Sequence, residues 1–245
     1  MQPMASVPAD PEPHDRKHNC LGPLTLLDEA DGWRLPLNSR YRGWRLAVKR
    51  SIDLVGSLVL LVVLSPLAVV GAAAVAATGG RPILFRQQRV GRHGRLFTIY
   101  KLRTMRADAD DVLRADRALA ERHRRGGYKL ELWEDPRITP VGRHLRRFSI
   151  DELPQLINVV RGDMSLVGPR PIVPSELTEY GDYAPAYLAA WPGITGAWQV
   201  AGRDEVKYPE RAALDAAYVA AWSLATDPII LLRTVPAALG ARGVR

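Results

Sequence analysis

The chain has 245 residues, a formal net charge of +8 and an isoelectric point near 9.9. That length allows one or two domains with a substantial core, and a hydrophobic content of 47% is ordinary for a globular protein. The positive charge predicts an anionic partner, such as a phosphorylated substrate, an acidic lipid or a nucleic acid. Cys20 is the only cysteine, which excludes a disulfide framework within the chain.

The first part of the chain is polar and rich in proline, and it shows no sustained hydrophobic periodicity. This composition predicts a disordered or loosely docked leader over residues 1–44. No apolar run follows the first residues, so the leader is not predicted to be a secretory signal.

A long apolar run comes next, with no charged residue between Asp53 and Arg81. A helix needs about 20 apolar residues to cross the hydrocarbon core of a bilayer, so residues 45–80 are predicted to form a membrane helix. Ser65 and Pro66 lie near the middle of the run. They predict a sharp bend, because proline removes a backbone hydrogen bond and a serine hydroxyl can bond to a carbonyl of the preceding turn.

Both flanks of this run are basic, and basic flanks stay on the cytoplasmic side of a membrane. The flanking cations are Arg45, Lys49 and Arg50 before the run, and Arg81, Arg86, Arg89, Arg92 and Arg95 after it. If both flanks stay on one side, the helix enters and leaves the membrane by the same face, as a re-entrant helix. A kinked spanning helix is the alternative, since prolines also occur in spanning helices.

Two short β-prone runs, residues 83–85 and 96–100, surround a glycine turn and predict a β-hairpin. Lys101 and Arg103 follow the second run and alternate with apolar residues, so both could face a site. The many arginines between residues 81 and 106 can also be explained as a basic surface beside lipid headgroups.

The remaining elements are predicted to be mainly helical. Residues 108–125 are charged and alanine-rich, residues 175–190 have an amphipathic pattern with tyrosines, and residues 204–233 return to a helical pattern. A loop over residues 191–203 carries tryptophans, which suit a membrane interface.

The segment from Arg146 and Arg147 to Asp151 and Glu152 places two adjacent carboxylates beside two arginines. Such cations hold phosphate oxygens, and a carboxylate either binds a metal ion or attacks phosphorus. The alternative is purely structural, because Ser149 and Glu152 fit a capping box that starts a helix.

A second loop, residues 166–174, is stiffened by prolines and would hold Arg170 at a fixed angle. A rigid linker that carries an exposed arginine is the alternative explanation.

Taken together, these residues resemble the bacterial sugar transferase family, the monotopic phosphoglycosyl transferases that place the first sugar phosphate on a polyprenol phosphate carrier. The resemblance covers roughly residues 48–233. Its motifs lie at residues 49–53, 65–66, 100–105, 149–155, 162–171 and 192–196.

The predicted elements and the resemblance together imply a mainly helical α+β fold. The expected protein is monotopic, with a bent re-entrant membrane helix, a small β-hairpin and amphipathic interfacial helices. Residues 81–245 would form a catalytic domain on the cytoplasmic face of the inner membrane. The chain resembles the short form of the family, without the extra membrane spans of longer relatives, and a homodimer is compatible with the fold.

The resemblance also implies a mechanism. Asp151, kept ionised by nearby arginines, attacks the β-phosphorus of a nucleoside diphosphate sugar, usually a UDP-sugar, and the sugar phosphate then passes to polyprenyl (undecaprenyl) phosphate. Such a step primes the synthesis of exopolysaccharide, capsule, O-antigen or glycoconjugate. Mg²⁺ is expected at Asp151 or Glu152. The expected phosphate-binding residues are Arg146, Arg170, Lys101, Arg103 and Arg147.

Two departures from the family pattern lie in a region implied to help choose the sugar, so the identity of the sugar stays open. They are the order Ala197-Trp198-Gln199 and the missing asparagine at Ala221-Trp222-Ser223. A non-catalytic membrane-anchored scaffold that binds anionic lipid or partner proteins is the alternative function. Nucleic acid is not an expected partner, because the sequence shows no helix-turn-helix, finger or aromatic–basic sheet motif.

Overall fold

The computed structural model describes residues 43–78, 81–125, 130–202 and 206–239. The helices are α1 (Trp44–Ala77), α2 (Ala109–Ala115), α3 (Arg117–Arg125), α4 (Pro140–Arg147), α5 (Gln155–Arg161), α6 (Ala184–Ala189), α7 (Ala197–Ala201), α8 (Glu210–Ala221) and α9 (Thr226–Leu239). The strands are β1 (Leu84–Val90), β2 (Leu96–Leu102), β3 (Ser165–Val167) and β4 (Gly193–Thr195), and the 3₁₀ segments are η2 (Arg92–Gly94), η3 (Ile150–Glu152) and η4 (Pro174–Tyr183). The described chain is therefore mainly helical, as expected. The predicted leader lies, except for its last two residues, outside the described residues.

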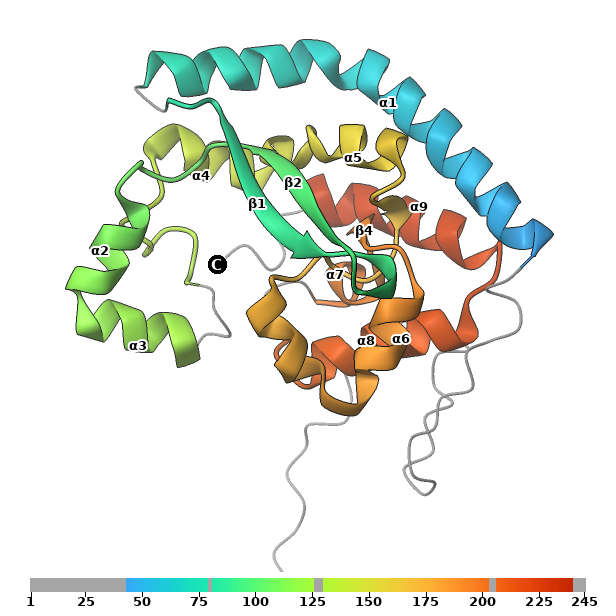
Figure 1. Ribbon diagram of the computed structural model, residues 1–245. Helices are drawn as coiled ribbons and strands as arrows, with labels where there is room; N and C mark the ends of the chain where they lie inside the picture. Colours follow the sequence, from blue (N-terminus) through green and yellow to red (C-terminus); the bar gives the residue numbers. More distant parts are fainter. Residues whose placement is uncertain (1–42, 79–80, 126–129, 203–205, 240–245) are drawn as a thin grey trace, which may run out of the picture.

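The apolar run forms α1, a single helix of 34 residues that continues through Pro66. The hydroxyl of Ser65 donates to the carbonyl of Val62 over 2.9 Å, as the sequence predicted. Figure 1 shows that α1 changes direction along its length and arches over the hairpin and α5. The proline therefore lies in a bent helix and does not break it.

The first part of α1 is tethered to the rest of the chain by buried polar side chains. Lys49 Nζ donates to the carbonyl of Val167 over 3.0 Å and to Asp227 Oδ2 over 2.6 Å. Asp53 Oδ1 accepts from the backbone N–H of Leu166 over 3.0 Å. The beginning of α1 therefore packs on β3 and α9.

The last part of α1 packs on a different surface of the same body. Val75 forms a core cluster with Leu102 of β2 and Leu145 of α4. Gly71 lies so close to this cluster that a Cβ atom there would meet Leu102 Cδ1 at 3.0 Å. Both parts of α1 thus contact elements that follow it in the chain.

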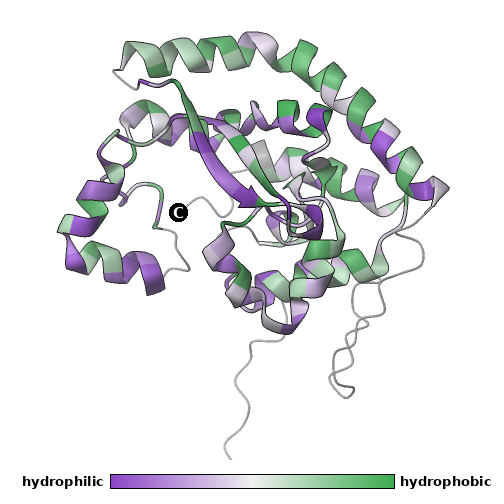
Figure 2. Cartoon of the chain, viewed as in Figure 1, coloured by the Kyte–Doolittle hydropathy of each residue, from purple (hydrophilic) through white to green (hydrophobic). Residues whose placement is uncertain are grey.

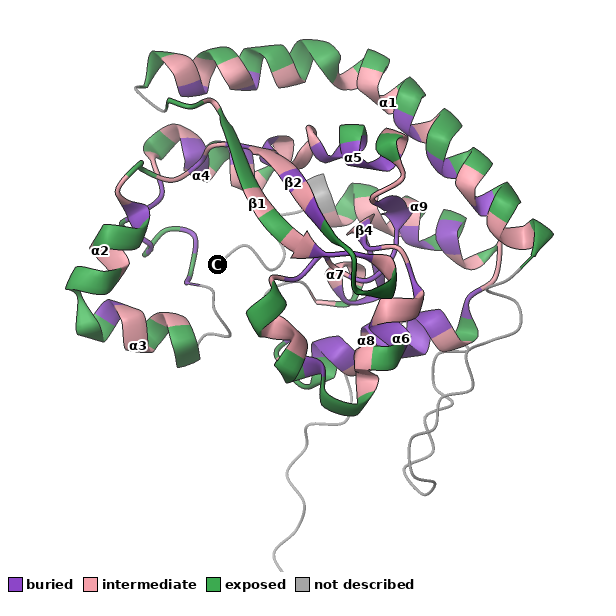
Figure 3. Cartoon of the chain, viewed as in Figure 1, coloured by how far each residue is buried: buried purple, intermediate pink, exposed green. Residues whose placement is uncertain are grey.

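The outer face of α1, between these two contacts, is apolar and exposed. Valines and leucines cover it, and Val62 is 75% exposed. Figures 2 and 3 show the hydrophobic character of the helix and the exposure of its outer side. Among the described residues, only α1 is long and apolar enough to cross a membrane. An exposed apolar helix of this kind indicates membrane association.

The predicted hairpin is confirmed. β1 pairs antiparallel with β2, and the register places Arg89 opposite Phe97 and Leu84 opposite Leu102. Because side chains alternate between the two faces of a strand, Arg89 shares a face with Ile99 and Lys101.

The predicted loop over residues 191–203 is wrong in part. Residues Gly193–Thr195 form β4, which pairs parallel with β3, and α7 follows directly. The pairing needs glycine, because a Cβ atom at Gly193 would come within 2.1 Å of the backbone nitrogen of Gly168. The pairing of β3 with β4 joins segments that are far apart in the sequence, so the residues of either segment alone do not predict it.

Other helix predictions hold with changes. The stretch 108–125 divides into α2 and α3, the stretch 175–190 divides into η4 and α6, and the stretch 204–233 contains α8 and part of α9. Gly181, with φ of 46°, interrupts η4. These stretches are mainly helical as predicted, but the sequence did not reveal where one helix ends and the next begins.

Several aromatic residues lie in the core, among them Trp198 of the loop that was expected at a membrane interface. Trp198 and Trp222 are 4% and 0% exposed, and Tyr180 and Tyr187 are also buried. Trp222 Nε1 donates to Asp227 Oδ1 over 3.1 Å, and the Tyr180 hydroxyl donates to Asp215 Oδ2 over 2.8 Å. The polar tips of Trp222 and Tyr180 therefore have buried acceptors, whereas Trp198 Nε1 has no hydrogen-bond partner among the described residues. The expectation of an interfacial anchor is wrong for Trp198, because its ring is buried.

Candidate active site

The two adjacent carboxylates lie in a tight 3₁₀ turn between α4 and α5. Ser149 adopts a left-handed conformation with φ of 56°, and its side chain forms no capping hydrogen bond. Helix α5 begins only at Gln155. The capping-box explanation is therefore wrong. The turn instead places Asp151 inward, where its side chain is buried.

Two of the predicted cations flank the carboxylates. Lys101 Nζ, at the end of β2, lies 2.7 Å from Glu152 Oε1. Arg146 Nε donates to Thr104 Oγ1 over 2.7 Å. Both cations lie close enough to Asp151 to favour its ionised form. Strand, helix and turn thus bring together residues that the sequence separates.

Burial decides the protonation of Asp151. Desolvation raises its pKa, and the neighbouring charge of Glu152 raises it further, while Lys101 and Arg146 lower it. The net pKa lies above the ordinary aspartate value, which corrects the expectation that the cations alone would set it. Desolvation likewise lowers the pKa of Lys101, against the opposing charge of Glu152.

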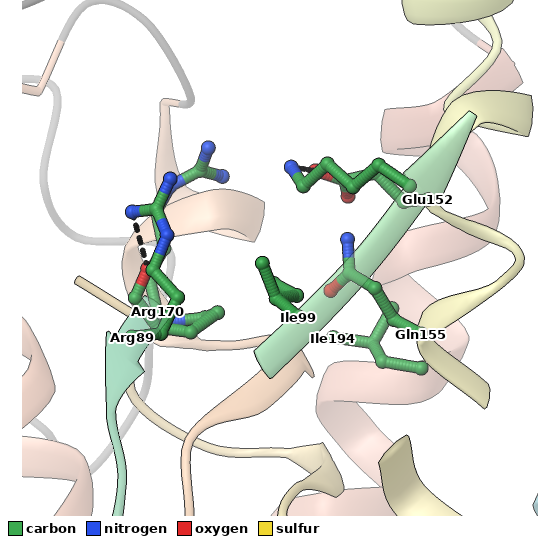
Figure 4. Close-up of a pocket in the computed structure, with 8 residues that line it drawn as sticks. Arg89, Ile99, Glu152, Gln155, Arg170 and Ile194 are labelled. Carbon is green, nitrogen blue, oxygen red and sulfur yellow. Dashed lines mark hydrogen bonds and ion pairs between the residues drawn. The ribbon is translucent and has the colours of Figure 1, made fainter. Parts of the chain in front are cut away.

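A small open pocket of about 230 Å³, including the space at its mouth, lies beside this turn. Its lining residues are Arg89, Ile99, Lys101, Glu152, Gln155, Arg170, Pro171 and Ile194. Figure 4 shows Arg89 and Arg170 on one side, facing Glu152 and Gln155 on the other. The predicted residue Arg170 therefore does face the same pocket as Lys101 and Glu152.

The two arginines make one wall of the pocket strongly positive. Burial, and then the positive charge of Arg170, lowers the pKa of Arg89. Arg89 is fixed by donating to the carbonyl of Pro171 over 3.0 Å. Two guanidinium groups that repel each other are stabilised by an anion between them, and phosphate oxygens fit such a pair.

Arg170 is supported from behind by buried groups. Its guanidinium lies 5.8 Å from the ring centre of Trp198, and Arg211 approaches the same ring at 4.7 Å. The backbone N–H of Arg170 also interacts with Asp215, which in turn accepts from Tyr180. This packing holds the loop that the prolines were predicted to stiffen.

Arg146, Arg147 and Arg103, the other three predicted phosphate-binding residues, do not line the pocket, although the charge of Arg146 acts on Asp151. The guanidinium of Arg147 lies 5.6 Å from the ring centre of its neighbour Phe148. The backbone N–H of Arg103 donates to the carbonyl of Ile83 over 2.8 Å, which continues the hairpin. The alternation of Lys101 and Arg103 on a short strand does not extend the pocket to Arg103.

The sequence did not identify two polar residues of the pocket, Arg89 and Gln155, or its apolar residue Ile194. Arg89 could have been found from strand periodicity, because it shares a hairpin face with Lys101. Gln155 stands four residues after Asp151, which is one helical turn. Ile194 had no local signal, since its place depends on the parallel pairing of β4.

Asp151 and Glu152 are the two carboxylates that could bind the expected Mg²⁺. Among the described residues, no group of three or more histidine, cysteine or acidic side chains could hold a metal ion. Mg²⁺ commonly uses only one or two carboxylates and takes its other ligands from substrate phosphates and water. Asp151 and Glu152, which repel each other in a buried turn, fit that pattern.

Comparison with known proteins gives a consistent result. Undecaprenyl-phosphate galactose phosphotransferase of Salmonella typhimurium is 47% identical over 195 residues, which cover 78% of this chain and 40% of that protein. Exopolysaccharide production protein ExoY of Sinorhizobium fredii is 42% identical over 199 residues, which cover 80% of this chain and 87% of that protein. UDP-glucose:undecaprenyl-phosphate glucose-1-phosphate transferase of Caulobacter vibrioides is 42% identical over 233 residues, which cover 89% and 78% of the two chains.

The chain thus spans less than half of the Salmonella protein but most of the other two. Residues 44–241, from the start of α1 to beyond α9, match the family described as bacterial sugar transferase. These residues include α1, the carboxylate turn and every pocket residue. The chain therefore belongs to the bacterial sugar transferase family.

Proposed function

We propose that this protein transfers a sugar 1-phosphate from a UDP-sugar to undecaprenyl phosphate through a phosphosugar intermediate on Asp151. The observation that carries the proposal is the position of Asp151, a buried carboxylate flanked by Lys101 and Arg146 beside a pocket with an arginine wall. The names of the relatives from Salmonella and Caulobacter, which act on undecaprenyl phosphate, support it. The product would prime the synthesis of a polysaccharide or glycoconjugate.

The chemistry proceeds in two displacements at phosphorus. In the first, a carboxylate oxygen of Asp151 attacks the β-phosphorus, the bond to the bridging oxygen breaks, and nucleoside monophosphate leaves with both electrons. In the second, a phosphate oxygen of the carrier attacks the same phosphorus, and the bond to Asp151 breaks. The aspartate is regenerated and the product is a polyprenyl diphosphate sugar. Dividing the transfer lets one site handle a soluble donor and a lipid acceptor in turn.

The cations of the site hold the anionic substrates. Arg89 and Arg170 bind phosphate oxygens at one wall, and Lys101 and Arg146 neutralise charge around Asp151. Mg²⁺, held by Asp151 or Glu152, would neutralise further charge on the diphosphate when it is bound.

We also propose that α1 enters and leaves the membrane by one face, so that the catalytic residues lie at the cytoplasmic surface of the inner membrane. Lys49 near the start of α1 and Val75 near its end both pack on the domain that carries Asp151. A straight spanning helix would separate these two ends by the bilayer thickness of about 30 Å, with only one end beside the domain.

Cysteine labelling tests this topology in a Cys20→Ser background. We expect Ala47→Cys and Thr78→Cys, which are exposed near the two ends of α1, to react with a membrane-impermeant maleimide from the cytoplasmic side only. Val63→Cys, on the apolar outer face, should stay protected until detergent is added. Labelling of Ala47→Cys and Thr78→Cys from opposite sides would show a spanning helix instead.

The chemistry is tested with a panel of UDP-sugars and undecaprenyl phosphate. Wild-type protein should release UMP with at least one donor. Without the acceptor, that donor should leave a phosphosugar adduct that intact-mass spectrometry locates on Asp151. Asp151→Asn should abolish both the release and the adduct, while Asp110→Asn on α2 should retain both. Turnover with an adduct on another residue would refute the assignment, and lipid binding without turnover would favour the scaffold alternative.

A further inference from the structure

Gln155 carries an unsatisfied hydrogen-bond donor in the interior of the protein. Its side chain is 2% exposed, and its amide nitrogen Nε2 has no hydrogen-bond partner within the described part of the chain. A buried donor without a partner destabilises the folded state, so proteins retain few of them. The next buried amide of the same helix, Asn158, donates to the carbonyl of Thr98 over 2.8 Å and accepts from the N–H of Tyr100. Of these two buried amides of α5, that of Gln155 is therefore the one without a partner among the described residues.

The position of Gln155 indicates where that partner binds. Gln155 lines the pocket together with Arg170, and Figure 4 shows its amide on the side opposite the arginine wall. Leu153 and Pro154 keep helical backbone angles between η3 and α5. Residues four apart on a helix are neighbours on one face, so Gln155 follows Asp151 by one turn on the same side.

We propose that Gln155 is a substrate-contacting residue, whose amide N–H donates to an oxygen of the phosphoryl group in transit on Asp151. This inference rests on the proposed function and adds one further contact to it. The partner is an acceptor oxygen, because the unsatisfied group is a donor. The phosphoryl group bound to Asp151 brings such oxygens to within one helical turn of the amide.

A neutral donor suits this position better than a further cation. Lys101 and Arg146 already lie near Asp151, and the positive charges of Arg89 and Arg170 already repel each other on one wall of the pocket. An amide adds a directed hydrogen bond without further repulsion between cations. Since the bond forms only when the phosphoryl group is present, it contributes to kcat and not to the stability of the free protein.

The test is Gln155→Met, which keeps the length of the side chain and removes the amide. Stability and turnover should change in opposite directions. The unfolding temperature of the free protein should stay the same or rise, because a buried polar group without a partner is lost. The kcat for UMP release should fall by about tenfold to a hundredfold, as for one hydrogen bond to a charged group. The assay uses full-length protein and the UDP-sugar that gives the highest wild-type rate.

Two further variants make the result decisive. Gln155→Glu places a carboxylate against the phosphoryl oxygens, so its kcat should fall below that of Gln155→Met at neutral pH. Asn158→Leu, whose amide is satisfied inside the protein, should show the reverse pattern, with a lower unfolding temperature and a kcat per folded enzyme close to wild type.

The remaining outcomes would overturn the inference. A kcat within about threefold of wild type for Gln155→Met would show that the amide makes no contact in the reaction. A lower unfolding temperature, or a failure of both Gln155 variants to fold, would show a structural role. An inactive wild type, in contrast, would refute the proposed function itself, whatever the variants do.

Discussion

Gly71 of the apolar helix lies against Ile150, the residue that precedes Asp151. A Cβ atom at position 71 would come within 3.2 Å of Ile150 Cγ2 and 3.3 Å of Leu145 Cδ2. The long apolar helix therefore touches the turn that carries Asp151, the proposed nucleophile. In the proposed reaction, undecaprenyl phosphate held beside α1 would have only a short path to that carboxylate.

Gly71→Leu is expected to separate these two parts of the site. Its side chain has no space beside Ile150 and Leu145, so α1 must move or the cluster must repack, at a cost of about 1–3 kcal/mol. Transfer to undecaprenyl phosphate should fall more than adduct formation, because the donor half-reaction does not need the lipid. Ala73→Leu, at an exposed position two residues on, is the matched control. Equal loss in both half-reactions would contradict a role in presenting the lipid.

The buried pair of Lys49 and Asp227 is expected to dominate the attachment of the first part of α1. Asp227 accepts a hydrogen bond from the Tyr218 hydroxyl over 2.7 Å. The cation beside it is Lys49, whose Nζ lies 2.6 Å from Asp227 Oδ2. Lys49→Met leaves the charge of Asp227 buried without a cation, which costs about 3–5 kcal/mol. Thermal unfolding in detergent should show the loss, whereas Arg114→Met in an exposed pair should change little. Restoration of stability in the double variant Lys49→Met, Asp227→Asn would confirm the pairing.

The pH dependence of the first half-reaction should report on Asp151. Only the ionised carboxylate attacks phosphorus, so the rate falls as the pH drops through its pKa, which lies above the ordinary aspartate value. Lys101 lowers that pKa, so Lys101→Met should raise it and move the acid limb of the kcat profile to higher pH. Stopped-flow measurement of UMP release across pH, with Arg114→Met as control, checks the shift. An unmoved limb would mean that another group controls the rate.

The raised pKa of Asp215 should make the free energy of unfolding depend on pH, separately from catalysis. Burial raises its pKa to about 7 in the folded protein. An unfolded aspartate has a pKa of about 4, so between these values the folded state holds a proton that the unfolded state has lost. The resulting stabilisation is fully present below about pH 4 and is lost as the pH rises through about 7. Asp215→Asn stays neutral and can still accept from Tyr180.

The unfolding temperature of Asp215→Asn should therefore rise relative to that of wild type as the pH increases from 5 to 8. Equilibrium unfolding in detergent at several pH values measures the difference. A constant difference across this range would show that Asp215 is ionised throughout.

Several features were accessible from the sequence because their signals are local. The apolar run identified α1, two short β-prone runs around a glycine turn identified the hairpin, and adjacent charges identified the turn with Asp151 and Glu152. Prolines marked the extended loop of Arg170. Each of these conclusions needs only residues within one segment, where side-chain chemistry limits the backbone directly.

Tertiary structure decided what these segments do together. Whether Arg103 or Arg89 lines the pocket depends on how the hairpin packs against η3 and the Arg170 loop, and the structure places Arg89 there. Trp198, expected at a membrane interface, is a core residue, and Tyr180 and Trp222 are buried where Asp215 and Asp227 accept their hydrogen bonds. The protonation of Asp151 depends on burial, which no local pattern of charges reveals.

The amino-acid sequence by itself determined the family and the long apolar helix, and it pointed to Asp151 as the proposed nucleophile, because these rest on composition and on short motifs. Only the folded chain decided which cations lie near that carboxylate and that the buried amide nitrogen of Gln155 lacks a partner among the described residues. The physical reason is that charge–charge interactions, desolvation and hydrogen bonding act over a few ångströms, and residues far apart in the sequence come within that range only after folding.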